Sequence, residues 1–140
     1  MQKISKAPIL FVISSLAVLL DQLTKLIFVE KLPSLVLCNA GVGFGLSPGR
    51  FDSILLSSSV LFLVFGALLY FWKQNKKQGP ILPLALVMGA ALSNLLDRVF
   101  RGCVIDYIDL KVWPSFNLAD VLITFGLVWT VYALFSRTDS

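Results

Sequence analysis

The residues best suited to catalysis are two aspartates in the last third of the chain, Asp106 and Asp120. Asp120 has no basic residue within a helical turn, and the nearby Asp106 is another carboxylate. Two carboxylates held close together cannot both ionise cheaply, so such a pair shares one proton. One group can then activate a water molecule while the other protonates a carbonyl oxygen or a leaving amine. The pair therefore predicts hydrolysis of a peptide bond.

The composition offers few other groups that could perform this chemistry. The chain contains no histidine, the commonest general base and metal ligand, and no serine is flanked by lysine in a way that suggests a nucleophile. Cys38 and Cys103 lie far apart and fit no metal spacing, so we expect no metal and no other cofactor. The two cysteines could pair in an oxidising space, but we expect two unpaired buried thiols, the usual state of free cysteine.

The elements that position the aspartates are predicted to be apolar helices. Of the 140 residues, 57% are hydrophobic and 14% charged, and the mean hydropathy is +0.85. A soluble chain of this length needs more polar surface, so a lipid solvent is indicated. We expect one domain, residues 1–140, that is an all-α membrane protein with a small β element and a short connector on its outer face. The four expected transmembrane helices cover residues 8–29, 54–72, 81–100 and 116–135.

Residues 30–53 differ in composition from the apolar spans on either side. Glycine and proline punctuate the segment, and the run 35–38 predicts a short strand. We therefore expect an outer, turn-rich β element at the membrane interface. Few apolar contacts can tie down Gly41, Gly43 and Gly45, so this element is expected to move and to cover a bound substrate.

The basic residues predict an orientation. Cytoplasmic segments of membrane proteins carry an excess of lysine and arginine. Such an excess marks both tails and residues 73–79, whereas the opposite side of the chain is nearly balanced in charge. We therefore expect both termini to be cytoplasmic, with residues 30–53 and the connector 101–115 outside. The residues on the expected cytoplasmic side are Lys3, Lys6, Lys73, Lys76, Lys77 and Arg137.

The charged residues of the spans gather at one end, the expected outer end. The cytoplasmic halves of all four spans contain none. A path for ions or protons needs polar groups across the full thickness of the membrane, so the pattern favours a site at one interface over a small transporter. Three hypotheses are therefore considered: a protease with its site at one interface, a small transporter, and a non-catalytic subunit that binds a partner through the glycine-rich element. The charged residues at the outer ends are Asp21, Lys25, Asp97, Arg98 and Asp120.

Helical spacing places several polar residues on shared faces, and these residues also have a purely structural interpretation. In the third span one stripe contains Asn94, Asp97 and Arg98, and in the fourth Asn117 and Asp120 share a face. Structurally, the first span would contain an internal ion pair, the third span two interfacial anchors, and the asparagines would hydrogen-bond between helices. The residues concerned are, in that order, Asp21 with Lys25, Asp97 with Arg98, and Asn94 with Asn117.

Five sequence blocks follow one another along the chain and carry a family resemblance. They are DQLTK at 21–25, NAGVGF at 39–44, GAALSNLLDR at 89–98, VIDY at 104–107 and FNLAD at 116–120. Together and in this order they resemble the lipoprotein signal peptidase family, bacterial signal peptidase II. Gly43 stands where alanine is usual and the chain is on the short side, and neither departure touches the polar positions.

The resemblance implies a four-span aspartic protease of the bacterial cytoplasmic membrane, with its active site at the outer face. Its substrate would be a diacylglyceryl-modified prolipoprotein, cut just before the lipidated cysteine. We expect a monomer whose partners are this substrate and membrane lipid, without nucleic acid. The family's catalytic aspartates fall on Asp106 and Asp120. Its other polar and glycine positions, which hold the site or the substrate, fall on Asp21, Lys25, Asn39, Gly41, Asn94, Asp97, Arg98 and Asn117.

Overall fold

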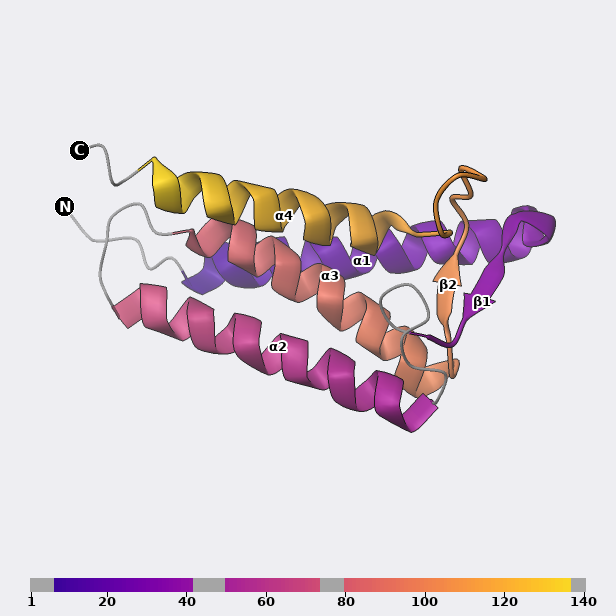
Figure 1. The fold of residues 1–140 in the computed structure, drawn as a ribbon, viewed down its shortest axis with the longest axis horizontal. Helices are drawn as coiled ribbons and strands as arrows, with labels where there is room; N and C mark the ends of the chain where they lie inside the picture. Colours follow the sequence, from indigo (N-terminus) through magenta and orange to yellow (C-terminus); the bar gives the residue numbers. More distant parts are fainter. Residues whose placement is uncertain (1–6, 42–49, 74–79, 137–140) are drawn as a thin grey trace.

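The computed structural model describes residues 7–41, 50–73 and 80–136. Within these ranges the chain forms four long helices and a two-stranded sheet (Figure 1). Each helix is long and apolar enough to cross a membrane, which confirms the predicted all-α architecture with a small β element. The helices are α1 (Ala7–Lys31), α2 (Arg50–Lys73), α3 (Ile81–Phe100) and α4 (Leu118–Phe135).

The helix bounds depart from the expected spans at polar ends. α3 coincides with the expected range, whereas α1 and α2 extend by mostly polar residues into the segment expected as an outer β element. Hydrogen bonding continues a helix beyond its apolar stretch, because water satisfies the last turn. α4 begins later than expected because Phe116 pairs with Ile108 in an isolated β-bridge and Asn117 caps the helix.

α3 lies at the centre of the bundle and packs against the other three helices (Figure 1). Two glycines permit close approach. A Cβ on Gly89 would overlap the backbone of Ser14 in α1, and a Cβ on Gly126 of α4 would lie 2.5 Å from a methyl carbon of Val87. The Ser14 hydroxyl also donates to the Ala85 carbonyl oxygen of α3 at 2.8 Å. Small residues thus bring the backbones of α1 and α4 against α3.

The sheet lies across one end of the bundle. β1 (Leu37–Asn39) pairs antiparallel with β2 (Val104–Asp106), with Leu37 opposite Asp106. The predicted strand at 35–38 is therefore wrong by about two residues, because Pro33 begins a 3-10 turn (η1, Pro33–Leu35) that occupies Leu35. Behind the sheet, the ring of Tyr107 stacks on Phe28 of α1 with centroids 4.1 Å apart, which fixes β2 against the helices.

Cys38 and Cys103 form a disulfide, so the expectation of two unpaired thiols is wrong. The register places Cys38 opposite Ile105, and the two cysteine Cα atoms lie 5.4 Å apart, within normal disulfide reach. The expected burial holds for Cys103, which is 5% exposed, whereas Cys38 is exposed. The cysteines are 65 residues apart in sequence, so only the strand pairing reveals that they meet.

The predicted mobile glycine-rich cover falls largely on residues 42–49, which lie outside the described residues. Gly41, at the edge of this segment, is described and half-buried. Its backbone N–H donates to the Asn39 side-chain oxygen at 3.0 Å. Gly41 is thereby tied to the end of β1.

Candidate active site

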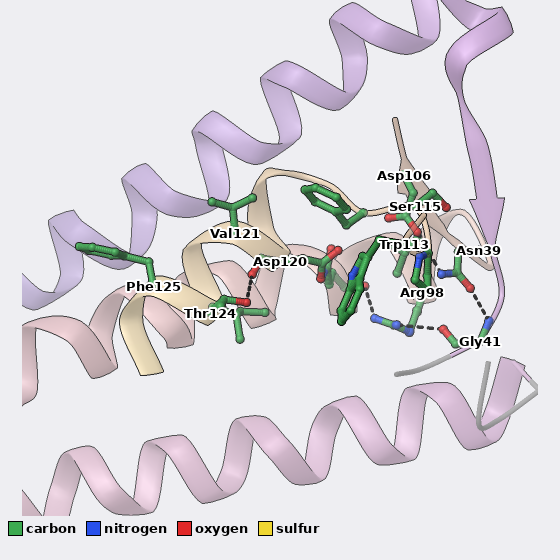
Figure 2. Close-up of a pocket in the computed structure, with 15 residues that line it drawn as sticks. Asn39, Gly41, Arg98, Asp106, Trp113, Ser115, Asp120, Val121, Thr124 and Phe125 are labelled. Atoms are coloured by element: carbon green, nitrogen blue, oxygen red, sulfur yellow. Dashed lines mark hydrogen bonds between the residues drawn. The ribbon is translucent and has the colours of Figure 1, made fainter. Parts of the chain in front are cut away.

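The two aspartates of the predicted pair line one cleft at the sheet end of the bundle (Figure 2). Asp106 ends β2 and is 1% exposed, while Asp120 lies in the first turn of α4 and is half-buried. The cleft has a volume of about 750 Å³ and extends from the aspartates along α4 to Phe125. Its other lining residues include Asn39, Gly41, Asn94, Arg98, Trp113, Pro114, Ser115, Phe116, Val121 and Thr124.

A capping box places Asp120. The Asn117 side-chain oxygen accepts the Asp120 backbone N–H at 3.0 Å, and the Asp120 carboxylate accepts the Asn117 N–H at 3.2 Å. This reciprocal arrangement satisfies two backbone donors that a helix start otherwise leaves free. The motif that begins α4 therefore also fixes the position of the second carboxylate.

Three asparagine amides hold the two carboxylates. Asp106 accepts from Asn39 at 3.0 Å and from Asn117 at 2.8 Å, and Asp120 accepts from Asn94 at 2.9 Å. The Asn117 amide also donates to the Asn94 side-chain oxygen at 3.2 Å. The carboxylates are thus linked through two amides that lie between them, and Asn94 and Asn117 also make the interhelix contact that the structural interpretation predicts.

The pKa of the Asp106 carboxyl is raised to about 6. Burial is the largest cause, because removal from water disfavours the charged form. The hydrogen bond from Asn39 lowers the pKa, while the charge of Asp120 raises it. The Asp120 carboxylate is thus close enough to Asp106 to disfavour a second negative charge there.

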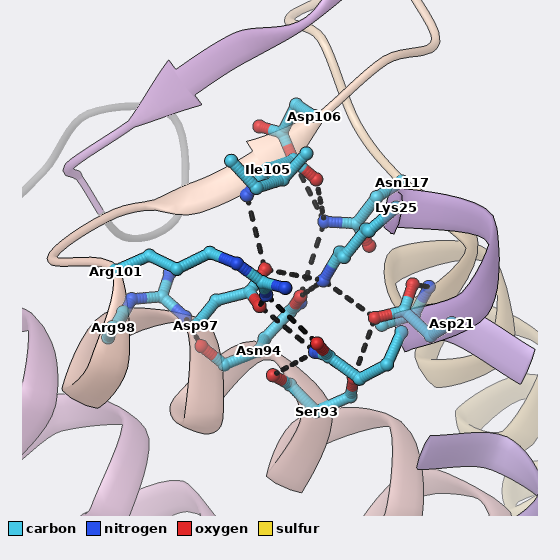
Figure 3. Close-up of polar contacts among 12 residues, drawn as sticks. Asp21, Lys25, Ser93, Asn94, Asp97, Arg98, Arg101, Ile105, Asp106 and Asn117 are labelled. Atoms are coloured by element: carbon cyan, nitrogen blue, oxygen red, sulfur yellow. Dashed lines mark hydrogen bonds and ion pairs between the residues drawn. The ribbon is translucent and has the colours of Figure 1, made fainter. Parts of the chain in front are cut away.

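A buried network of charged side chains, Asp21, Lys25 and Asp97, lies next to the aspartate pair (Figure 3). The Lys25 ammonium lies 2.6 Å from Asp21 and 2.8 Å from Asp97, and all three side chains are fully buried. The same ammonium donates to the Asn94 side-chain oxygen at 2.9 Å. Because that oxygen faces Lys25, the amide nitrogen of Asn94 is directed at Asp120. The network therefore reaches the predicted aspartate pair through one amide, that of Asn94.

The two carboxylates of the network also hold backbone segments in place. Asp21 accepts the Ala119 N–H of α4 at 2.8 Å, where the helix dipole favours an anion. Asp97 accepts the Ile105 N–H of β2 at 3.2 Å. α4 and β2, which carry the two aspartates of the pair, are therefore both anchored to the network. The structural interpretation is correct for the Asp21–Lys25 ion pair and wrong for Asp97 as an interfacial anchor.

Arg98 is also buried rather than interfacial, with 8% of its surface exposed. Its guanidinium donates to the backbone oxygen of Asn94 at 3.3 Å and to that of Gly41 at 3.1 Å. Among the described residues, the buried Arg98 Nε has no hydrogen-bond partner. Arg98 thus joins α3 to the end of β1.

The structure brings all ten sequence-predicted site residues into one connected set, and it adds residues that sequence reasoning missed. Gln22 donates to Asp97 at 2.9 Å and to Ser93 at 2.9 Å, and it accepts from Arg101. Tyr107 donates to the Thr24 hydroxyl at 2.9 Å. A polar Gln22 beside Asp21 in an apolar span was a usable signal. Nothing in the sequence pointed to the pairing of Tyr107.

Comparison with known proteins gives a consistent result. The family model described as Signal peptidase (SPase) II matches residues 13–136. The lipoprotein signal peptidase of Halothermothrix orenii is 31% identical over 140 residues, which cover 91% of this chain and 95% of the relative. That of Pelotomaculum thermopropionicum is 33% identical over 145 residues, with 93% of each chain covered.

Solved structures agree with these sequence matches. A bacterial membrane enzyme superposes with a TM-score of 0.76 at 26% identity, over 99% of this chain and 94% of the other. A second bacterial membrane enzyme gives a TM-score of 0.72 at 25% identity. Since the family model covers most of the chain and nearly full-length relatives exceed 30% identity, this chain belongs to the signal peptidase II family of bacterial multi-pass membrane proteases.

Proposed function

We propose that this protein is an aspartic endopeptidase that removes signal peptides from diacylglyceryl-modified prolipoproteins, cutting just before the lipidated cysteine. The observation that carries the proposal is the placement of Asp106 and Asp120 in one cleft, each held by amide donors. Membership of the signal peptidase II family supports removal of signal peptides from prolipoproteins. We assign the aspartate pair to the chemistry and the other eight predicted residues to its support.

In the proposed reaction, water attacks the carbonyl carbon of the scissile bond while one carboxylate takes a proton from that water. The other carboxyl group, which is protonated, donates its proton to the carbonyl oxygen. The tetrahedral intermediate then breaks its C–N bond as a proton passes to the leaving amine of the lipidated cysteine. The signal peptide leaves with a new carboxyl group, and the pair regains its single proton.

Arg98 is the proposed donor to the developing oxyanion. Its side chain lines the cleft that contains both aspartates. Its buried Nε lacks a partner among the described residues, and leaving a buried donor unsatisfied costs free energy. Substrate binding would have to turn the guanidinium so that this buried N–H group faces the cleft, where it would donate to the substrate carbonyl oxygen and stabilise charge in the transition state.

The cleft suits a substrate that stays in the membrane. Val121 and Phe125 line it on α4, and both side chains are exposed toward the space where lipid surrounds a membrane helix. Acyl chains on the substrate cysteine can remain in lipid while the peptide bond reaches the aspartates at the helix ends, and this positioning contributes to the rate. We propose a monomer, because both aspartates and the amides that hold them belong to one chain.

A defined substrate tests the proposed function. The purified protein in lipid vesicles is given a synthetic prolipoprotein peptide with a diacylglyceryl cysteine, together with the same peptide lacking the lipid. Mass spectrometry should find a product that begins at the lipidated cysteine and little cleavage of the unlipidated peptide. Added hydroxylamine should yield no hydroxamate of the signal peptide, because no acyl-enzyme forms when water attacks directly. Hydroxamate formation, or a cut elsewhere, would contradict the proposal.

The proposed orientation places the sheet end outside and residues 73–79 in the cytoplasm. An impermeant thiol reagent should label Cys38 from outside once the disulfide is reduced. In a chain with both native cysteines replaced by serine, Asn75→Cys should be labelled only after the membrane is opened. Labelling of position 75 from outside in intact cells would overturn the orientation.

The hydrogen bond from Asn39 predicts a shift in the pH dependence of cleavage. This bond stabilises ionised Asp106 and lowers its pKa, so Asn39→Ala should raise that pKa above its native value of about 6. The limb of the kcat/KM profile that reports ionisation of Asp106 should therefore move to higher pH. Ser53→Ala is the matched control, because Ser53 bonds to the neighbouring Ala40 carbonyl and leaves Asp106 untouched. An unmoved limb in Asn39→Ala would contradict the assignment of that limb to Asp106.

A further inference from the structure

The segment between β2 and α4 exposes an unusual amount of apolar side chain. Within residues 109–115, here called the 109–115 loop, Leu110 is 57% exposed, Trp113 58% and Val112 90%. These side chains belong to a connection between elements and not to a membrane-spanning helix. In water they would form a concentrated apolar surface, and such surfaces mark contact with another phase or molecule.

Hydrogen bonds at the base and at the turn of the loop keep these apolar side chains exposed. Its base is closed by the bridge between Ile108 and Phe116, whose two backbone hydrogen bonds measure 2.9 and 3.0 Å. Asp109 accepts the Lys111 backbone N–H at 2.8 Å, and Lys111 adopts a left-handed φ of 64°. A non-glycine residue in that conformation is strained by about 1 kcal/mol or more, and such strain concentrates at functional segments. The turn that exposes Val112 is therefore specified by its own hydrogen bonds.

The loop lies at the level of apolar helix surface. In Figure 1 β2 and the segment after it run across the helix axes, and α1 continues past them along the long axis of the bundle. Near the end of α1 two apolar side chains are exposed, Ile27 at 56% and Val29 at 42%, and the polar residues Glu30 and Lys31 follow them. Tyr107, just before the loop, contacts Thr24 and Phe28 of α1, so the base of the loop lies at the level of these residues and α1 continues beyond them.

We propose that the 109–115 loop inserts into the lipid interface, with Leu110, Val112 and Trp113 at the boundary between headgroups and acyl chains. Tryptophan and lysine are the side chains typical of this layer. The Lys111 ammonium lies 2.7 Å from the Asp109 carboxylate, so the tip brings no net charge to the lipid.

The surface of the loop is continuous with that of the membrane helices. Trp113 lines the same cleft as Val121 and Phe125, which are 43% and 57% exposed on α4. A loop seated in the interface would therefore hold the mouth of the cleft at lipid level. The position of the loop in the interface does not depend on the proposed reaction.

Depth-dependent fluorescence quenching tests the proposal. Trp72→Phe and Trp129→Phe leave Trp113 as the single tryptophan, and the protein is placed in phosphatidylcholine vesicles. Spin labels near the glycerol end of the acyl chain should quench Trp113 more strongly than labels near the methyl end, and aqueous acrylamide should quench it weakly. Strong acrylamide quenching with no response to either lipid label would overturn the proposal. So would protection from acrylamide that arises only when substrate is added, since the loop would then cover substrate instead of entering lipid.

A paired substitution in the same background checks the cause. Val112→Asp should increase acrylamide quenching and decrease quenching by the shallow lipid label, because it places a charge on the inserted tip. Leu35→Asp adds the same charge to another exposed residue, in η1, and should leave Trp113 unchanged. Equal responses in the two variants would show that the charge acts on the whole protein, and the assignment of the loop would fail.

Discussion

Asp106→Asn and Asp120→Asn are each expected to lower turnover by roughly four orders of magnitude, since removing one member of a catalytic unit removes most of what the unit does. Asparagine keeps the size of the side chain but can neither take a proton from water nor hold the proton that the pair shares. Single-turnover cleavage of the lipidated peptide measures the loss. Binding of the substrate should persist, because its acyl chains and signal helix contact other parts of the protein.

Asp109→Asn is the matched control for this prediction. It removes the same charge from the same connector, yet Asp109 is exposed and does not line the cleft. Its hydrogen bonds with Lys111 lower the pKa of the Asp109 carboxyl, and we assign this group no part in proton transfer. Asparagine retains an oxygen that can accept the Lys111 N–H, so activity should change little. A variant at 109 as inactive as Asp106→Asn would mean that the wrong carboxylate had been chosen, and an active Asp120→Asn would remove the aspartic mechanism.

Lys25→Met should destabilise the fold by about 3–5 kcal/mol, the usual cost of removing one partner from a buried ion pair. The substitution leaves Asp21 and Asp97 buried without their shared cation, from which they lie 2.6 and 2.8 Å away. Thermal unfolding of the two proteins in detergent measures the effect, as the fraction of folded protein that remains at each temperature. Activity should fall as well, because Lys25 orients the Asn94 amide toward Asp120.

Two further variants separate this effect from a general loss of charge. Lys111→Met breaks an ion pair whose lysine side chain is 84% exposed, so its unfolding should barely change. Adding Asp97→Asn to Lys25→Met should recover part of the stability, since it removes one of the uncompensated carboxylates. A double variant less stable than Lys25→Met would contradict this account of the network.

Residues within one helix were the most predictable part of the molecule. The bounds of α3 follow from Pro80 before it and from Arg101 and Gly102 after Phe100, where Gly102 has a left-handed φ of 82°. The stripe of Asn94, Asp97 and Arg98 follows from helical periodicity alone, and the structure places all three in the site. A fixed backbone geometry repeats regularly, so sequence spacing converts directly into shared faces.

Contacts between distant segments were not predictable in the same way. The register of β1 against β2 depends on the 3-10 turn at Pro33, and short strands carry too few residues to specify their pairing. Arg98 donates to backbone oxygens, one of them on Gly41. A contact with a backbone oxygen cannot be predicted from the pattern of side chains. Gln22 was likewise missed, because an amide in an apolar span indicates a polar contact but does not identify its partners, here Ser93 and Asp97 on α3.

The disulfide has a consequence for how the chain matures in the cell. α2 and α3 both lie between Cys38 and Cys103 in sequence, so in the proposed orientation the two thiols reach the same compartment only after both helices have crossed the membrane. A chain whose α3 stalls during insertion keeps Cys103 in the reducing cytoplasm, where the bond does not form. The Cys38–Cys103 disulfide therefore forms only in molecules whose α2 and α3 have both been inserted. The fraction of disulfide-bonded chain on a non-reducing gel measures correct insertion without a cleavage assay.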